Sequence, residues 1–256
     1  MLLIYTPHIT NRIQYIMQYI FEEKFGINYQ LINNIEAYKN DKHYLKIAYA
    51  NQNIQEGLFF YADTLLFQEN IQSIELNAGF FNNIKVLFAH SNNLSALPFD
   101  VFAAIFYLLS RYEEYLNEPL DKFQNYNYSN SILFKQKILD TPIVEQWLEL
   151  LKEILLKNFP YLQFKNHTPK FALSFDIDVA YAYKNRSIAI TAGGIAKKII
   201  QLNFNEVKNQ LLTLLNKKKD KYDTYAYIFS SIKNKKPIFF FDMGDYGKFD
   251  KNPSWK

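Results

Sequence analysis

The sequence predicts an α/β fold, because short strand-like apolar runs alternate with amphipathic helical segments along the chain. The apolar run at residues 2–5 precedes helical spacing of apolar residues over 11–25. The run at residues 237–241 follows two further helical segments. This order of elements favours parallel strands joined by helical crossovers. With 256 residues, 49% of them hydrophobic, the chain is long enough for one large or two modest packed domains.

Residues 1–165 are predicted to form an N-terminal α/β domain. The expected elements are strands at 2–5, 44–50, 57–61 and 85–89, and helices at 11–25, 97–116 and 141–158. Gly26 is a natural stop for the first helix, and Pro119 for the second. The helix over 97–116 has a wide apolar surface, so we expect it to lie in the core. Arg111 near its end could bind a ligand, but an ion pair with Glu114 is the simpler explanation.

Residues 166–169 are short, polar and aperiodic, and are therefore the predicted boundary between domains 1–165 and 166–256. In the second domain we expect a strand at 171–178, helices at 204–215 and 223–233, a buried strand at 237–241 and an acidic loop at 242–250. The Gly193-Gly194 pair lies in a stretch without a phosphate-binding G-x-x-x-x-G-K pattern, and we interpret it as a loop.

Charge and composition exclude several classes of function. The net charge is +4, but the lysines are scattered apart from short runs at 217–219 and 233–236, so a nucleic-acid partner is not expected. The absence of cysteine excludes disulfides, thiolate metal sites and cysteine nucleophiles. The sequence shows neither a signal peptide nor an apolar run long enough to span a membrane, which favours a cytoplasmic location.

The strand at 171–178 ends in two carboxylates, Asp176 and Asp178. Alternation along the strand puts both on the face that also carries Ser174. Two like charges this close require a cation, a proton or a neighbouring basic group. Ligands of parallel α/β folds gather at this end of the strands. A solvated strand end followed by a helix cap is the alternative, and the apolar strand leading into the pair favours the functional interpretation.

Other catalytic chemistry has little support in the residues. The histidines are His8, His43, His90 and His167. All precede Asp176, so the second domain does not encode a complete zinc site of the usual histidine-bearing kind. His167, which precedes Thr168-Pro169, fits a linker better than a metal ligand. The sequence also lacks a G-x-S-x-G motif and a credible Ser/His/Asp set.

Three stretches resemble bacterial polysaccharide-deacetylase-like proteins of the Bacteroidetes type, which carry an extra N-terminal domain. They are residues 99–115 (FDVFAAIFYLLSRYEEY), residues 173–178 (LSFDID), and residues 222–225 (YDTY) together with 239–250 (FFFDMGDYGKFD). The second stretch is similar to the first motif of the deacetylase (NodB-like) domain. The resemblance implies a distorted (β/α) barrel that removes acetyl groups from an acetylated glycan.

By the same resemblance, Asp176 is the general base that takes a proton from a metal-bound water, and Asp178 ligates the divalent metal, expected to be Zn²⁺. The family's histidine motif and later strands would follow residue 241, whereas the sequence ends at Lys256. We therefore expect a C-terminally incomplete deacetylase domain that binds Zn²⁺ weakly and is inactive alone.

Two alternatives remain. The stretch ending in Asp176 and Asp178 also resembles the first motif of haloacid-dehalogenase-like phosphatases, with Asp176 as nucleophile and Asp178 as acid/base. Gly244-Asp245 and Asp250 would then form the Mg²⁺-binding motif. The non-enzymatic alternative is a glycan-binding or scaffolding role for residues 1–165, whose aromatic side chains could stack on sugars.

Overall fold

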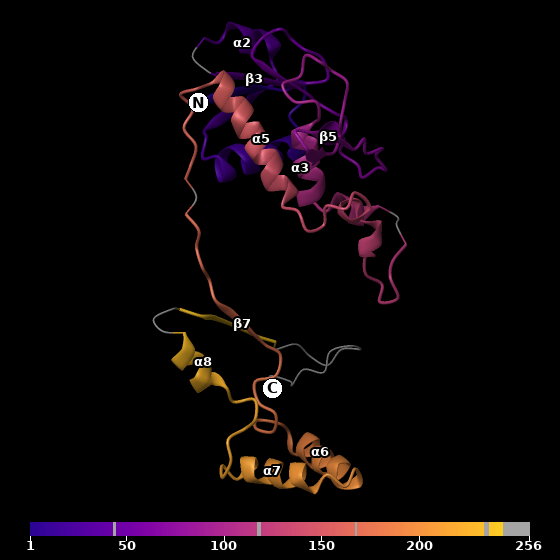
Figure 1. Ribbon diagram of the computed structural model, residues 1–256, viewed down its shortest axis with the longest axis vertical. Helices are drawn as coiled ribbons and strands as arrows, with labels where there is room; N and C mark the ends of the chain where they lie inside the picture. The colour runs from indigo at the N-terminus through magenta and orange to yellow at the C-terminus, as the bar shows by residue number, and fades with distance from the viewer. Residues whose placement is uncertain (43–44, 117–118, 167, 233–235, 243–256) are drawn as a thin grey trace. The chain divides into compact units, whose positions relative to one another are not determined.

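The chain divides into two compact units, Met1–His167 and Thr168–Lys256 (Figure 1). The computed structural model describes residues 1–42, 45–116, 119–166, 168–232 and 236–242. The boundary expected between residues 165 and 166 lies two residues before this division. Each unit contains its own parallel sheet with helices, so the α/β class is confirmed.

The first unit is built on a four-stranded parallel sheet with the strand order β2-β1-β3-β4. Its strands are β1 (Leu2–Tyr5), β2 (Tyr29–Ile32), β3 (Leu45–Ala50) and β4 (Leu58–Tyr61). The sequence pattern predicted all of these except β2. That strand lies at the sheet edge and none of its residues is fully buried, so its hydrophobic pattern is weak.

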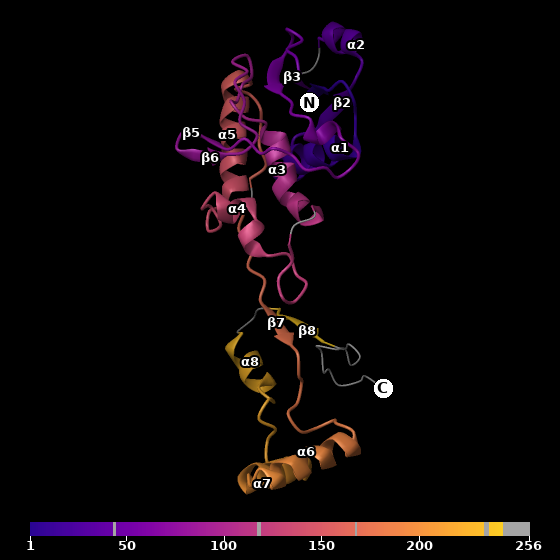
Figure 2. The same cartoon turned by 90° about the vertical axis from the view of Figure 1, so that its right-hand side faces the viewer.

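Helices cover both faces of this sheet (Figure 2). They are α1 (Asn11–Met17), α2 (Ile35–Asn40), α3 (Val101–Leu109) and α5 (Ile143–Asn158), while the short α4 (Ile132–Lys135) lies away from the sheet. Leu2 and Ile4 pack with α1, α3 and α5 in the larger core. Leu3 and Tyr5 pack with Tyr38 of α2 on the opposite face. Alternation along β1 therefore supplies two cores, and the sheet is the middle layer of three.

Two expected helices of this unit differ from the structure. The helix over 11–25 begins as α1 and continues as a π-helical segment η1 (Gln18–Lys24), after which Gly26 turns the chain with φ 67°. The helix expected over 97–116 is shorter. Asp100 caps its start, and it ends with α3 at Leu109, because Arg111 adopts a left-handed conformation with φ 51°. The prediction that this helix continues to Leu116 and is stopped by Pro119 was wrong.

The remaining elements of the first unit are a short hairpin and three 3₁₀ turns. They are the antiparallel hairpin β5 (Gly79–Phe81) and β6 (Ile84–Val86), and the 3₁₀ turns η2 (Leu65–Phe67), η3 (Tyr112–Tyr115) and η4 (Tyr128–Asn130). Trp147 of α5 is fully buried, and its indole N–H donates to the Lys85 carbonyl at 2.8 Å. This bond fixes α5 against the hairpin, since a buried indole N–H needs an acceptor.

The second unit contains a parallel pair of strands and three described helices. They are β7 (Ser174–Ile177), β8 (Ile238–Phe241), α6 (Ile188–Ile200), α7 (Phe204–Leu214) and α8 (Tyr225–Ser231). Gly193 and Gly194 lie inside α6, so the loop expected there was wrong. Gly194 faces the α7 residue Gln210, where a longer side chain would approach the Gln210 amide.

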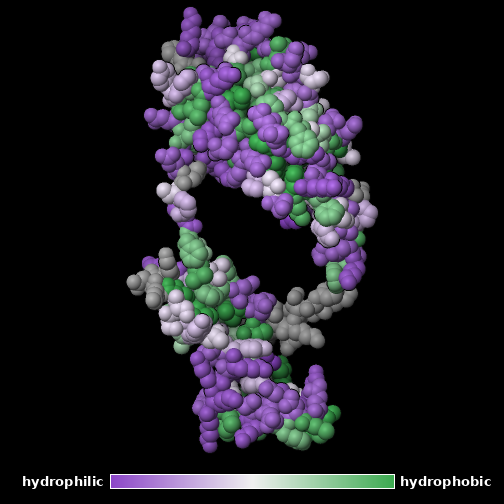
Figure 3. All heavy atoms as spheres, viewed as in Figure 1, coloured by the Kyte–Doolittle hydropathy of each residue, from purple (hydrophilic) through white to green (hydrophobic). Residues whose placement is uncertain are grey.

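β8 was expected to be buried, and this was wrong for the described residues. Ile238, Phe240 and Phe241 are exposed, and Phe171 before β7 is exposed as well. Figure 3 shows apolar atoms at the surface of this unit over the β7–β8 sheet and α8. A strand keeps such side chains exposed when elements cover only one face of its sheet.

Candidate functional site

The two acids singled out from the sequence lie at the carboxyl end of β7. Asp176 is the third residue of the strand and pairs in register with Phe240 of β8, while Asp178 occupies the bend directly after the strand. Both acids are exposed. Phe175, which precedes Asp176, and Ile177, which lies between the two acids, are half-buried. The expected alternation is therefore present over Ser174–Ile177, with Asp176 and Ser174 on one face.

Aromatic packing shows which face of this sheet the acid occupies. Phe175 stacks on Phe239 of β8 at 5.2 Å between ring centroids, and Phe229 of α8 packs on the same Phe239 ring at 5.5 Å. Paired residues of neighbouring strands point to the same side of a sheet. Helix α8 therefore covers the Phe175 face, and Asp176 lies on the opposite face, which the described residues leave exposed.

A third carboxylate, Asp242, follows β8 directly and was not singled out from the sequence. Its backbone N–H donates to the Ile177 carbonyl at 3.3 Å. Because Ile177 pairs with Phe241, Asp178 and Asp242 follow the two strands at the same level. The parallel register brings three acids to one edge of the sheet. A signal existed in the sequence, since both apolar strands end in aspartate, but only strand pairing relates the two ends.

The metal donors do not form a complete set in the part of the chain that the structure describes. Among those residues, no three His, Cys, Asp or Glu side chains are placed to hold one metal ion together. His167, Gly244, Asp245 and Asp250 lie outside the described residues. Carboxylates suit hard divalent cations, and a catalytic zinc needs about three protein ligands. The described acids by themselves therefore do not make up such a site.

Asp220 fixes the chain that follows Asp178. Its carboxylate is buried and accepts four backbone N–H groups, from Ala182, Tyr183 and Lys184 at 2.8, 2.8 and 3.2 Å and from Tyr222 at 3.0 Å. Burial raises the pKa of Asp220, but the four hydrogen bonds to its charged form outweigh burial, so the pKa lies below its ordinary value. Sequence reasoning missed this residue, because three of its four bonding partners are far away in sequence.

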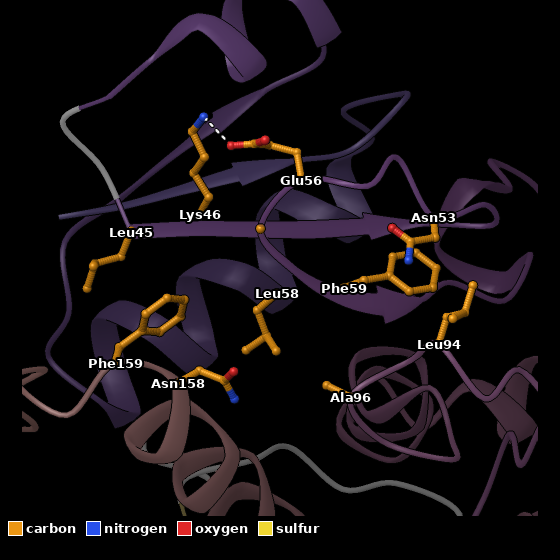
Figure 4. Close-up of a pocket in the computed structure, with 11 residues that line it drawn as sticks. Leu45, Lys46, Asn53, Glu56, Leu58, Phe59, Leu94, Ala96, Asn158 and Phe159 are labelled. Carbon is orange, nitrogen blue, oxygen red and sulfur yellow. Dashed lines mark hydrogen bonds and ion pairs between the residues drawn. The ribbon is translucent and has the colours of Figure 1, made fainter.

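The first unit contains a cavity of about 510 Å³ between the start of β3 and β4 and the end of α5 (Figure 4). Lys46 and Glu56 form an ion pair of 2.8 Å on one side of β3, while Leu58, Asn158 and Phe159 lie on the other side. Lys46 also donates to the Lys39 carbonyl at 3.0 Å. Its charge is therefore satisfied within the protein, and the cavity lies at the amino end of the strands, opposite to the usual ligand edge.

A second cavity of the first unit, of about 610 Å³, lies beyond the end of α3. Arg111 lines it and forms the expected ion pair with Glu114, with its Nε donating to Glu114 Oε1 at 2.6 Å. The prediction of this ion pair is confirmed. Tyr107, Asn125 and Tyr128 also line this cavity.

Comparison with known proteins gives one match. A family of unknown function, DUF7033, matches residues 2–160, which is more than half of the chain. The chain belongs to this family. The DUF7033 region contains the four-stranded sheet, both cavities described above and helix α5, and it ends before the Asp176 strand. No curated protein and no solved structure matches the sequence significantly.

The helices give one further finding. Among the described residues, none of them combines the length and the apolar character that crossing a membrane requires.

Proposed function

We propose that the second unit is part of a metal-dependent polysaccharide deacetylase that hydrolyses acetyl groups on a glycan. The observation that carries this proposal is the position of Asp176 on the sheet face opposite to α8, at the carboxyl end of a parallel strand. In a (β/α) barrel the helices cover the outer face, and catalytic side chains lie at the carboxyl ends of the strands. Asp176 has this relation to the helix-covered face, and Asp178 directly follows the carboxyl end of the same strand.

In this proposal Asp178 holds a divalent cation, expected to be Zn²⁺, and Asp176 accepts the proton of the attacking water. A bound cation would polarise the acetyl carbonyl. The aspartate base must lie within hydrogen-bond reach of the water whose proton it takes. Asp176 precedes Asp178 by two positions, with Ile177 between them, so one segment of backbone sets the spacing between base and ligand. Asp242 is a further acid that follows the neighbouring strand at the same edge.

Titration of this 256-residue chain with Zn²⁺ tests the metal assignment. Since the described residues offer an incomplete donor set, we expect weak binding, with a dissociation constant of about 1 mM, near 4 kcal/mol of binding free energy. Asp178→Asn should weaken it further, whereas Asp140→Asn, which removes an exposed acid of the first unit, should not. Tight one-to-one binding, or equal binding by both variants, contradicts the assignment.

Acetate release tests the reaction itself. A protein that contains this chain together with a complete set of metal ligands, assayed on N- and O-acetylated oligosaccharides with Zn²⁺, should release acetate. Asp176→Asn should reduce the rate by about 10²-fold or more, since general base catalysis contributes factors of this size. A protein that releases no acetate from any of these substrates, or an Asp176→Asn variant of undiminished rate, argues against a deacetylase.

The phosphatase interpretation has a separate test in the same preparation. Hydrolysis of p-nitrophenyl phosphate that requires Mg²⁺ and is lost in Asp176→Asn would favour a haloacid-dehalogenase-like enzyme. The exposed face of the β7–β8 sheet favours the deacetylase, because such phosphatases are expected to have open parallel sheets with helices on both faces.

A further inference from the structure

The cavity beyond α3 has the features of a ligand site that the proposed catalysis does not use. We call it the Arg111 pocket, and define it by Tyr107, Arg111, Glu114, Asn125, Tyr128 and Ser131 among its lining residues. Its volume of about 610 Å³ lies in the range of small-ligand sites, about 300–1,000 Å³. It belongs to the DUF7033 region, so an inference from it stands whether or not the second unit is a deacetylase.

Arg111 occupies a position where the backbone favours glycine. It follows the last residues of α3 with φ 51° and ψ 41°, and its N–H donates to the Leu108 carbonyl at 3.1 Å. Helices commonly end with glycine in this left-handed conformation, and other residues lose about 1–2 kcal/mol there. The Arg111 side chain lines the pocket, with both Nε and Nη2 on Glu114.

Hydrogen bonds hold the wall of the pocket in place. Glu113 accepts the N–H of Ile132 at 2.8 Å, which ties the turn η3 to the start of α4. Ser131 caps the same helix by accepting the N–H of Leu133 at 3.2 Å, and Asn127 accepts the N–H of Ser129 at 3.1 Å. A ligand would therefore enter a site that is already formed, which reduces the entropy that binding must overcome.

Exposed apolar side chains lie at the pocket. Tyr128 is 66% exposed, and its ring packs edge-to-face on Phe134 with 5.3 Å between ring centroids. Phe134 and Leu139 are also exposed. Tyrosine has an apolar ring face and a polar hydroxyl, so it can cover the C–H face of a sugar ring and bond its hydroxyl groups. The guanidinium, carboxylate and amide groups of Arg111, Glu114 and Asn125 offer paired donors and acceptors to neighbouring hydroxyls.

Charge selects among the ligands that could use these groups. Arg111 supplies one positive charge, while Glu113 and Glu114 both line the pocket and supply two negative charges. The Arg111 charge is already paired with Glu114, so an anionic ligand would meet a net negative site. We propose that the Arg111 pocket binds a neutral oligosaccharide, with Tyr128 stacking on a sugar ring and Arg111 and Glu114 bonding its hydroxyl groups.

A glycan array with neutral and acidic glycans tests this proposal on the whole 256-residue chain. We expect signals on neutral glycans, and titration with the best of them should give weaker binding to Arg111→Gly by about tenfold or more, or about 1.4 kcal/mol. Glycine suits φ 51°, so this variant should fold with an unchanged or higher melting temperature. Tyr128→Ala, which changes an exposed side chain, should weaken binding similarly.

Lys137→Gly is the matched control. Lys137 also has a left-handed conformation, with φ 58°, and is exposed, so the substitution removes one cation from the same kind of backbone position outside the lining of the pocket. It should leave glycan binding unchanged. An array without signals, a preference for acidic glycans, or equal binding by wild type and Arg111→Gly overturns the proposal. None of these outcomes depends on acetate release, so the array result and the deacetylase assay can fail separately.

Discussion

Asp100 illustrates how one buried residue links the parts of the first unit. Its carboxylate caps α3 by accepting the Ala103 N–H at 2.9 Å, and it also accepts the Asp63 N–H at 2.7 Å and the Tyr49 hydroxyl at 2.8 Å. Burial raises the pKa of Asp100 to about 7, although these three hydrogen bonds act in the opposite direction. Asp100 therefore connects β3, the segment after β4, and α3. Its burial disfavours the charged form of the carboxyl group.

The raised pKa predicts a pH dependence of stability. Between the ordinary pKa of 3.8 and about 7, the folded protein holds a proton on Asp100 that the unfolded chain has lost. The stability from this group is complete below pH 3.8 and falls as the pH rises to about 7, by an amount on the order of 4 kcal/mol. Urea unfolding should be measured for the wild type and for Asp100→Asn from pH 4 to pH 7. As the pH rises over this range, the free energy of unfolding of Asp100→Asn should increase relative to that of the wild type. A constant difference, or the same gain in Asp140→Asn, contradicts this.

At the scale of elements, α6 shows a helix that tolerates two adjacent glycines. A side chain added at Gly193 would meet nothing within 4 Å, and one added at Gly194 would reach the Gln210 amide at 4.0 Å, an ordinary contact. Both positions therefore have room for a methyl group, and the glycines only weaken the helix.

We predict that Gly193→Ala stabilises α6 by about 0.8–1 kcal/mol, because alanine loses less backbone entropy than glycine in a helix. Circular dichroism should show higher helicity, and thermal unfolding a higher transition temperature of the second unit. The same change at Gly57 should have the opposite effect. There φ is 75° and the added methyl group would lie 2.3 Å from the Tyr38 hydroxyl and 2.8 Å from the Lys46 carbonyl. A destabilised Gly193→Ala protein would contradict the prediction.

At the scale of the molecule, the two units differ in how they bury apolar residues. Both hydrophobic clusters lie in the first unit, one on each face of its parallel sheet. In the second unit, Ala182, Tyr183 and Ile232 are the buried hydrophobic residues among those described, and many of its large apolar side chains are exposed. The first unit thus has the core that independent folding requires.

We therefore predict that residues 1–166 fold without the rest of the chain. Trp147 is fully buried and is the single tryptophan of this segment, so its fluorescence reports on the packing of α5. Urea unfolding followed by Trp147 emission and by circular dichroism should give one coincident, cooperative transition. Separate transitions, or an emission maximum of exposed tryptophan in buffer, would show that the segment needs the second unit.

The sequence by itself determined the elements whose signal is local. Hydrophobic spacing located β1, β3 and β4, the presence of a core helix at α3, and the alternation that separates Asp176 from Phe175 and Ile177. These depend on the period of the pattern within a few residues. The spacing of Asp176 and Asp178 was readable for the same reason, since one strand carries both.

The tertiary structure decided what depends on residues distant in sequence. It ended α3 at Leu109, kept two glycines in α6, and gave Asp220 its four backbone partners. It also placed Asp242 beside the end of β7 and put α8 on the face opposite to Asp176. Strand pairing and packing form these arrangements between segments that no short sequence pattern relates. Local periodicity therefore located the acids, and the packing of α8 and β8 determined what surrounds them.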